Sequence, residues 1–242
     1  MRKLVIIPTY NERENIEAMV AKVFSLEGDF SLLVVDDGSP DGTAEIVRQL
    51  QIAHPERLFL IEREGKLGLG TAYLTGFRWG LREGFDVIYE MDCDFSHDPD
   101  DLLRLTAAIE AGADVAIGSR YVSGVNVVNW PMRRLLLSFC ASRYVKCVTR
   151  MPVRDATAGF VAYRAEVLRT IDLDAVRMKG YGFQIEMKYT AWRLGFGIKE
   201  VSIIFRDRTL GTSKMSSGIL GEAFWGVLHL RFRRFRASAS RG

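Results

Sequence analysis

Two aspartates stand one residue apart directly behind a short apolar segment. Asp92 and Asp94 flank Cys93 and follow the run 87–91, which is typical of a buried strand. A strand that ends in this way delivers two carboxylates to the edge of a sheet. Carboxylate oxygens suit Mg²⁺ or Mn²⁺, and such an ion usually holds substrate phosphates as well. Acidic pairs are also common in solvated turns, so the pair alone is weak evidence for a metal site. Its position after several alternating strands and helices strengthens the prediction.

Two more polar clusters follow predicted strands. Residues 8–12 come directly after the first apolar run, and 36–39 come after the second. Because ligands of parallel sheets bind at the carboxyl ends of the strands, we expect all three clusters to meet at one edge. Asp36 and Asp37 taken alone fit a turn before a helix equally well. Their occurrence together with Asp92 and Asp94 favours a nucleotide site.

Strands and helices alternate along the front half of the chain. Apolar runs predict strands at 4–7, 32–35, 58–61, 87–91 and 115–118. Helical spacing predicts a first helix over 11–24, with Asn11 as its N-cap, and a second helix that begins after the cap Asp41. A third helix runs from a glycine-rich turn at 65–70 to Glu83, and a fourth begins at Pro99. The back half predicts helices at 130–149 and 183–194, a strand at 158–163 and an edge strand at 198–205. The fold class is therefore α/β, a mostly parallel sheet of Rossmann-like type with helices on both faces.

Composition narrows the class of protein. A chain of 242 residues with 48% hydrophobic residues can bury the core of one α/β domain. The three cysteines show no metal-type spacing, which predicts reduced thiols in a cytosolic protein. No apolar stretch reaches the length of a transmembrane helix, and the start of the chain lacks the pattern of a signal peptide. The near-neutral body predicts no nucleic-acid partner.

The end of the chain differs from the body. Five arginines and no acids lie beyond Leu230, and they exceed the whole net charge of +3. The segment 218–230 places apolar residues on one helical stripe, so we divide the chain into a main domain (1–217) and an amphipathic helix with a basic tail (218–242). Such a helix either lies on a membrane surface or packs on the protein core. The first alternative predicts a cytoplasmic protein peripherally attached to the membrane, through this helix or a small membrane subunit.

The motifs together resemble the inverting GT-A glycosyltransferases of family 2, and more narrowly the dolichyl-phosphate or polyprenyl-phosphate mannose synthases. The resemblance covers about residues 3 to 220 and is carried by the stretches 8–12, 36–43, 91–94, 118–121, 155–160, 182–187 and 208–214. It implies a GDP-mannose donor, a divalent metal (Mg²⁺ or Mn²⁺) and a polyprenyl phosphate acceptor.

The resemblance also implies roles for single residues. The nucleotide pocket is lined by Pro8, Tyr10, Glu12, Val35 and Asp37. The diphosphate meets Asp92, Cys93 and Asp94, with both aspartates on the metal and Ser96 at a position where a further metal-side group stands in some members. The positions that bind phosphate and act in transfer are Asp94, Arg120, Arg208 and Lys214. Either Arg133 or Arg134 would touch the acceptor phosphate, and Asp155 lies near the site. Independently of the resemblance, Glu186 stands on an otherwise apolar helix face, where an unpaired buried carboxylate is costly, so we expect it to pair with an arginine.

The acceptor decides what the site needs. A phosphate monoester is already ionised near neutral pH, since its second pKa is about 6, so no general base is required. Positive charge is required instead, to hold two anions close together. The main competing hypothesis is a sister enzyme that uses UDP-glucose or another nucleotide sugar. Two further hypotheses are an enzyme with a hydroxyl acceptor, which would need a general base, and a non-catalytic nucleotide-sugar-binding module.

Overall fold

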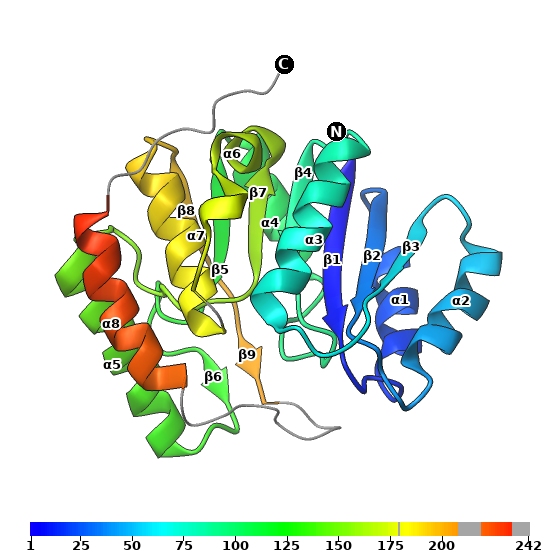
Figure 1. Ribbon diagram of the computed structural model, residues 1–242, viewed down its shortest axis with the longest axis horizontal. Coiled ribbons are helices and arrows are strands. Elements are labelled where there is room, and N and C mark those ends of the chain that lie inside the picture. The colour runs from blue at the N-terminus through cyan, green and yellow to red at the C-terminus, as the bar shows by residue number, and fades with distance from the viewer. Residues whose placement is uncertain (179, 208–218, 234–242) are drawn as a thin grey trace.

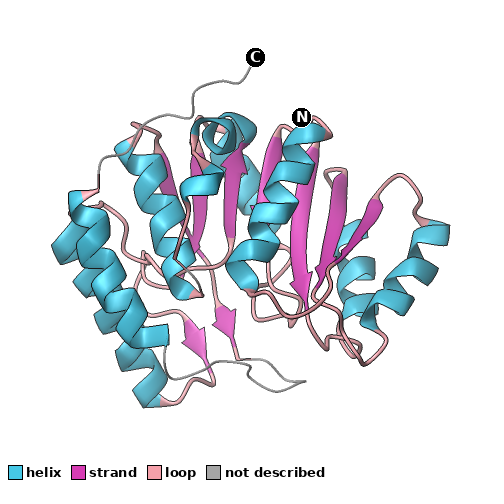
Figure 2. Cartoon of the chain, viewed as in Figure 1, coloured by secondary structure: helices cyan, strands magenta, loops and turns pink. Residues whose placement is uncertain are grey.

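A seven-stranded sheet forms the centre of the computed structural model, which describes residues 1–178, 180–207 and 219–233 (Figures 1 and 2). The spatial order of the strands is β3-β2-β1-β4-β7-β5-β8. Their bounds are β1 (Lys3–Thr9), β2 (Phe30–Asp36), β3 (Leu58–Glu62), β4 (Val87–Glu90), β5 (Val115–Ser119), β7 (Val161–Arg164) and β8 (Ile198–Ser202). A small second sheet pairs β6 (Val127–Val128) with β9 (Phe205–Arg206).

One strand runs against the others. β7 is antiparallel to both of its neighbours, β4 and β5, whereas the other pairs of the large sheet are parallel. The mostly parallel α/β fold is therefore confirmed. Sequence alone placed a strand here, at 158–163, but gave no direction for it.

Helices cover both faces of the sheet. The helices α1 (Ile16–Phe24), α2 (Thr43–Ala53) and α4 (Asp101–Glu110) pack on one face, and α3 (Leu69–Arg82), α6 (Ala165–Thr170) and α7 (Tyr181–Arg193) on the other. A 3₁₀ turn (Leu173–Ala175) leads towards α7. Along β1, Leu4 and Ile6 enter one hydrophobic core while Val5 and Ile7 enter the other, which explains its unbroken apolar run.

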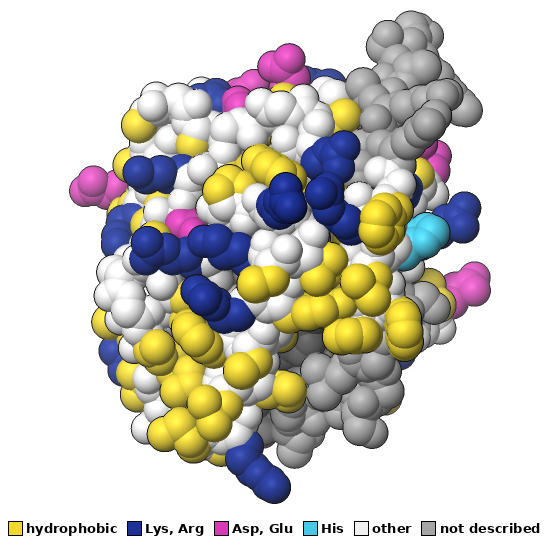
Figure 3. Space-filling view, turned by 90° about the vertical axis from the view of Figure 1, so that its left-hand side faces the viewer, with side chains coloured by type: hydrophobic (Ala, Val, Ile, Leu, Met, Phe, Trp, Pro, Cys, Tyr) yellow, Lys and Arg dark blue, Asp and Glu magenta, His cyan; other side chains and the backbone are white. Residues whose placement is uncertain are grey.

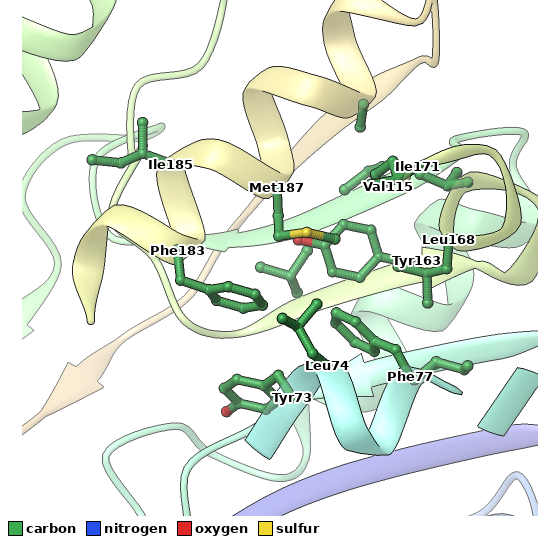
Figure 4. Packing of buried hydrophobic residues seen from close by; sticks show 14 of the residues in the cluster. Tyr73, Leu74, Phe77, Val115, Tyr163, Leu168, Ile171, Phe183, Ile185 and Met187 are labelled. Atoms are coloured by element: carbon green, nitrogen blue, oxygen red, sulfur yellow. The ribbon is translucent and has the colours of Figure 1, made fainter. Parts of the chain in front are cut away.

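α3 lies unusually close to the sheet. A Cβ atom added at Gly76 would come within 2.7 Å of Ile6 Cδ1 and 2.8 Å of Ile6 Cγ2. An adjoining side of α3 meets α7, where Tyr73 and Phe183 stack with ring centroids 6.0 Å apart (Figure 4). This packing fixes α7 relative to β4, a relationship that matters for the site below.

The first predicted helix starts later than expected. Asn11 has a left-handed backbone (φ 55°), so it belongs to a turn, and α1 begins at Ile16. Asp41 does support the next helix from just before its N-terminus, because its carboxylate accepts a hydrogen bond of 3.0 Å from the Thr43 amide. The turn at Asn11 keeps residues 10–12 at the edge of the sheet rather than wound into a helix.

Two helices form one end of the molecule. α5 (Met132–Thr149) and α8 (Ile219–Phe232) lie side by side (Figure 1). Tyr144 of α5 stacks on Phe224 of α8 with ring centroids 4.7 Å apart. Val227 and Leu230 of α8 are buried in the core, so core packing, one of the two alternatives for this helix, holds for part of it. Among the described residues, no helix is long and apolar enough to cross a membrane.

The same two helices expose a set of large apolar side chains, which we call the α5–α8 face. They gather on one side of the molecule, with lysines and arginines beside them (Figure 3). Its members are Met132, Leu136, Leu137, Phe139, Phe224, Trp225 and Phe232. Trp225 and Phe232 are 71% and 83% exposed, so burial of Val227 and Leu230 accounts for only part of the apolar residues of α8.

Candidate active site

The predicted clusters meet at the carboxyl ends of β1, β2 and β4. β1 lies between β2 and β4, and Thr9 stands opposite Asp36 in the register. All three strands run in the same direction, so the residues behind them share one edge of the sheet (Figure 1). The expected convergence of the clusters 8–12, 36–39 and 92–94 on one edge is confirmed.

Asp36 holds the loops of this edge together. Its carboxylate accepts hydrogen bonds from the Thr9 hydroxyl (2.8 Å), the Ser39 amide (2.8 Å) and the Ser39 hydroxyl (2.6 Å). The Ser39 hydroxyl in turn accepts a bond of 2.9 Å from the Asn11 amide. The side chain is thus engaged in structure, which matches the turn interpretation for Asp36.

Asp37 has a partner that the sequence did not suggest. The Arg63 guanidinium donates to its carboxylate through Nε at 2.6 Å, and both side chains are buried. Arg63 also donates to the Thr71 hydroxyl (2.8 Å) and the Gly68 carbonyl (3.2 Å). It follows β3 directly, so its place behind a strand was the signal that could have found it. The pair ties the glycine-rich turn to the end of β2, where the sequence predicts the nucleotide.

The other predicted nucleotide residues lie around this pair. Val35 is fully buried in β2, and Pro8 is part of β1 rather than its end. The Lys66 ammonium lies 4.9 Å from the centre of the Tyr10 ring. Glu12 accepts a bond of 2.9 Å from the Asn15 side chain. The turn that begins at Asn11 keeps Tyr10 and Glu12 next to the Asp36–Asp37 loop.

Three oxygen-bearing side chains lie behind β4. Asp94 is buried, its carboxylate accepts a bond of 3.0 Å from the Ser96 amide, and Asp92 is 38% exposed at the side chain. The Ser96 hydroxyl is buried and has no hydrogen-bond partner within the described part of the chain. These hard oxygens fit Mg²⁺ or Mn²⁺ as partial ligands that leave positions for phosphate oxygens and water. Within the same residues, no three Asp, Glu, His or Cys side chains converge as a complete protein-only site.

His97 is buried beside this loop. Its Nδ1 accepts a hydrogen bond of 3.3 Å from the Asp92 amide, and its ring stacks on Phe160 with centroids 5.0 Å apart. Burial lowers the pKa of His97 to about 4, with Asp94 opposing and Arg120 adding to the shift. The imidazole is therefore neutral near pH 7, with the proton on Nε2. It supports the backbone of the acidic loop from inside.

A buried ion pair lies on the other side of the site. Arg120 donates through Nε to Asp155 Oδ2 (2.7 Å) and through Nη2 to Oδ1 (2.6 Å), and its amide donates to Oδ2 at 2.9 Å. Arg120 Nη2 also donates to the Thr157 hydroxyl at 2.9 Å. Burial alone would raise the pKa of Asp155, but the Arg120 charge and hydrogen bonds outweigh it and hold that pKa below its ordinary value. Asp155 thereby fixes the direction of the Arg120 guanidinium.

Arg133 and Arg134 are distinguished by the structure. Arg134 lies 4.2 Å from the centre of the Trp130 ring and donates to Asp207 at 2.7 Å. The same Trp130 ring lies 5.4 Å from the Arg120 guanidinium, so Arg134 and Arg120 share a neighbour. Arg133 is exposed at the start of α5. Arg134 is therefore the one of the two that the fold places beside Arg120.

Three buried polar residues lie beneath the acidic loop. Glu90, the last residue of β4, accepts a bond of 2.7 Å from the Gln184 amide of α7. Gln184 accepts a bond of 3.4 Å from Lys188, one turn later on the same helix. Burial raises the pKa of Glu90 to about 8 and lowers the pKa of Lys188 to about 8. Sequence reasoning missed these residues. They could have been noticed as polar residues inside two segments, β4 and α7, that are otherwise typical of a buried core.

Glu186 has the structural role expected for it. Arg233, just beyond α8, forms an ion pair with its carboxylate, and the amides of Arg177 and Met178 donate to it at 3.0 and 2.8 Å. This contact joins α8 to α7. Two predicted phosphate-binding residues, Arg208 and Lys214, lie outside the residues that the structure describes.

A family model described as Glycosyl transferase family 2 matches residues 4–172. This chain belongs to glycosyl transferase family 2. The family 2 chain is 52% identical over 231 residues to a protein of Mycolicibacterium smegmatis (strain ATCC 700084 / mc(2)155) named polyprenol monophosphomannose synthase, covering 93% of this chain and 87% of that one. It is 47% identical over 232 residues to an undecaprenyl-phosphate mannosyltransferase of Micrococcus luteus, covering 94% and 95%.

Solved structures support the GT-A assignment of this family 2 chain at the level of fold. Glucosyl-3-phosphoglycerate synthase from Mycobacterium tuberculosis, in complex with Mn²⁺, UDP-glucose and phosphoglyceric acid, superposes with a TM-score of 0.67 at 20% identity. The match covers 93% of this chain and 79% of that one. The complex of the same enzyme with phosphoglyceric acid alone gives a TM-score of 0.65 at 21% identity, covering 95% and 78%.

Proposed function

We propose that this family 2 glycosyltransferase transfers mannose from GDP-mannose to a polyprenyl phosphate and produces polyprenyl-phosphate β-mannose. The observation that carries the proposal is the 52% identity, over almost the whole chain, to a polyprenol monophosphomannose synthase. The site described above supports it, because it combines acidic oxygens for a diphosphate–metal group with two neighbouring arginines, the buried Arg120 and the partly exposed Arg134, for a second phosphate.

The reaction exchanges one C–O bond for another. A phosphate oxygen of the acceptor attacks the anomeric carbon of mannose, the bond from that carbon to GDP breaks, and GDP leaves with the electron pair. Attack opposite the leaving group inverts the anomeric centre. The attacking oxygen is already ionised near neutral pH, so the chain has to position two anions rather than remove a proton.

The donor side consists of the residues behind β1, β2 and β4. We assign the nucleotide to the pocket of Pro8, Tyr10, Glu12, Val35 and Asp37, with Arg63 holding the Asp37 carboxylate in place. Cys93 meets the diphosphate through its backbone. Asp92 and Asp94, together with the Ser96 hydroxyl, would hold Mg²⁺ or Mn²⁺. When bound, the ion neutralises the charge of the departing diphosphate.

The acceptor side consists of cations. Arg120 is oriented by Asp155 and Thr157, and we propose that it and Arg134, rather than Arg133, bind the acceptor phosphate. A guanidinium donates charge-assisted hydrogen bonds to phosphate oxygens. Arg208 and Lys214 remain proposed phosphate ligands from the part of the chain that is not described.

We further propose that the enzyme works at the cytoplasmic membrane surface, where a polyprenyl acceptor has its head group. The α5–α8 face supports this, because it combines exposed aromatic and aliphatic side chains with neighbouring cations (Figure 3). The contact therefore extends from the proposed tail unit, 218–242, onto α5. Either lipid or a small membrane subunit can cover this face.

The donor is tested by supplying radiolabelled GDP-mannose and UDP-glucose separately with polyprenyl phosphate and Mg²⁺ or Mn²⁺. Lipid-soluble product from GDP-mannose at a rate far above that from UDP-glucose supports the proposal. The reverse preference would assign the enzyme to the sister activity. Binding of either nucleotide without any lipid product would favour a non-catalytic binding module.

The surface is tested by sedimentation with anionic liposomes. Phe232→Glu places a charge on the α5–α8 face, and Ile52→Glu places one on α2 at a residue that is equally exposed (both 83%). We expect only the first variant to lose binding. Equal binding of both variants and the wild type would contradict a lipid contact at this face.

A further inference from the structure

Lys188 is a buried lysine in the middle of α7. Its side chain has no exposed area. Transfer of an ammonium group from water to a protein interior costs several kcal/mol unless it is well paired, and a methionine would fill similar space without this cost. The residue therefore calls for a reason beyond filling the core.

Its hydrogen bonds go to one short loop. The ammonium donates to the carbonyl oxygens of Ala156 (3.0 Å) and Ala158 (2.5 Å). These two residues flank Thr157, and Ala156 directly follows Asp155. Both alanines are buried, so without Lys188 their carbonyls would face an apolar interior.

The same loop orients Arg120. Asp155 and Thr157 both bind the Arg120 guanidinium, at 2.6–2.7 Å and 2.9 Å. The Glu200 carboxylate accepts a bond of 3.0 Å from the Asp155 amide on the opposite side of the loop. Lys188 and Glu200 thus hold the loop from two elements, α7 and β8.

Lys188 also reaches the donor side. It donates to Gln184, which donates to Glu90, and Glu90 lies two residues before Asp92. The relay Lys188–Gln184–Glu90 connects the loop beneath Arg120 with the end of β4. Stacking of Tyr73 on Phe183 holds α7, the helix that carries two of the three residues (Figure 4).

We infer that Lys188 is a positioning residue for the acceptor phosphate: by fixing the carbonyls of Ala156 and Ala158, it fixes Asp155 and Thr157 and hence the direction of Arg120. This inference rests on the proposed role of Arg120 in the transfer. Lys188 itself touches no substrate. Its effect is therefore expected on the acceptor, while nucleotide binding is left intact.

The test compares Lys188→Met with Lys199→Met, which changes an exposed lysine of β8. Kinetics with varied polyprenyl phosphate and calorimetric binding of GDP are measured for both. For Lys188→Met we expect a loss of at least about tenfold in kcat/KM for the acceptor, which is the scale of a hydrogen bond to a charged group, and a change of less than about twofold in the Kd of GDP. A parallel loss in GDP binding would overturn the inference.

A double variant separates positioning from general weakening. If Lys188 acts through Asp155, the change Lys188→Met should add little to the activity loss of Asp155→Asn. Multiplicative losses in the double variant would mean that the two residues act independently, against the inference. Gln184→Met removes the bonds of Gln184 to Glu90 and to Lys188 but leaves the bonds of Lys188 to the carbonyls of Ala156 and Ala158. It is expected to give a smaller loss of the same kind and serves if Lys188→Met does not fold. Unchanged acceptor kinetics in this folded variant would then reject the relay.

Hydrogen exchange of the loop needs no turnover. Peptides spanning 153–161 should exchange faster in Lys188→Met than in the wild type, while peptides of β1 and β2 keep their rates. Unchanged exchange at 153–161 would refute the role of Lys188 in the loop even if the donor proves to be another nucleotide sugar. Absence of transfer by the wild type would instead refute the proposed function alone.

Discussion

Arg120 and Asp155 are 35 residues apart in the chain and form a buried ion pair with two parallel hydrogen bonds of 2.7 and 2.6 Å. The pair joins the end of β5 to the loop before β7, the strand that is antiparallel to its neighbours. The guanidinium is thereby held at the site edge without relying on a substrate.

Removal of the carboxylate should be costly. We expect Asp155→Ala to lower the free energy of unfolding by about 3–5 kcal/mol, because it leaves a buried arginine without its counter-charge. The pair is also sensitive to acid, because the pKa of Asp155 lies below its ordinary value of 3.8. The stabilisation from the pair is fully present above 3.8 and is lost as the pH falls through the lowered pKa. Urea unfolding at pH 7 measures the effect. A loss below about 1 kcal/mol would contradict it.

Lys188 predicts a gain in stability at alkaline pH. Its pKa is lowered from 10.5 to about 8, so between these values the unfolded chain holds a proton that the folded protein has released. Stability therefore rises with pH across this window, by at most roughly 3 kcal/mol at about 1.36 kcal/mol per pKa unit. Lys188→Met should lack this rise. Parallel curves of unfolding free energy for the two proteins between pH 8 and 10.5 would argue against it.

Arg134 and Arg133 form a matched pair of variants. Arg134→Ala should lower kcat/KM for polyprenyl phosphate by about 10–100-fold, since a hydrogen bond to a charged group contributes about 1.5–3 kcal/mol. Arg133→Ala removes an exposed cation and should change it less than about threefold, the effect of a weak surface charge. Steady-state assays with varied acceptor measure both. The opposite ranking would assign the acceptor contact to Arg133.

Asp94 should control metal affinity. Loss of groups that only support metal ligands costs about 10–100-fold, so Asp94→Asn is expected to weaken Mn²⁺ binding in the presence of GDP at least as much. Titration followed by electron paramagnetic resonance gives the affinity without any need for turnover. Asp98→Asn, in the same loop but exposed, is the control and should bind like the wild type.

Gly76 should tolerate no side chain. A Cβ at this position meets Ile6 of β1 at 2.7 Å. Overpacking of a core lowers the free energy of unfolding by about 1–3 kcal/mol, whereas alanine in place of glycine within a helix raises it by roughly 1 kcal/mol. We expect Gly76→Ala to lower the thermal midpoint. Gly65→Ala, where no atom lies within 4 Å of the added Cβ, should leave it nearly unchanged. Equal midpoints for the two variants would show that α3 shifts without cost.

The order of strands and helices was accessible from local patterns. Unbroken apolar runs such as 4–7 and 32–35 could only belong to strands covered on both faces, and this fixed the fold class. The helix start at Asn11 was wrong because the residue tolerates a left-handed turn as well as a cap, and only the contact of its amide with Ser39 selects the turn. The antiparallel direction of β7 was not accessible, since a four-residue apolar strand carries no sign of direction.

The sequence by itself determined which chemistry stands behind which strand: acids behind β2 and β4, and a polar turn behind β1. Parallel strands place their carboxyl ends together, so spacing along the chain is enough to predict this edge. Only the tertiary structure decided the partners. Arg63 binds Asp37, Asp155 binds Arg120, and Lys188 binds the loop that follows Asp155. Those contacts join residues 26 to 35 positions apart. The packing of whole elements sets such distances, and no local pattern contains them.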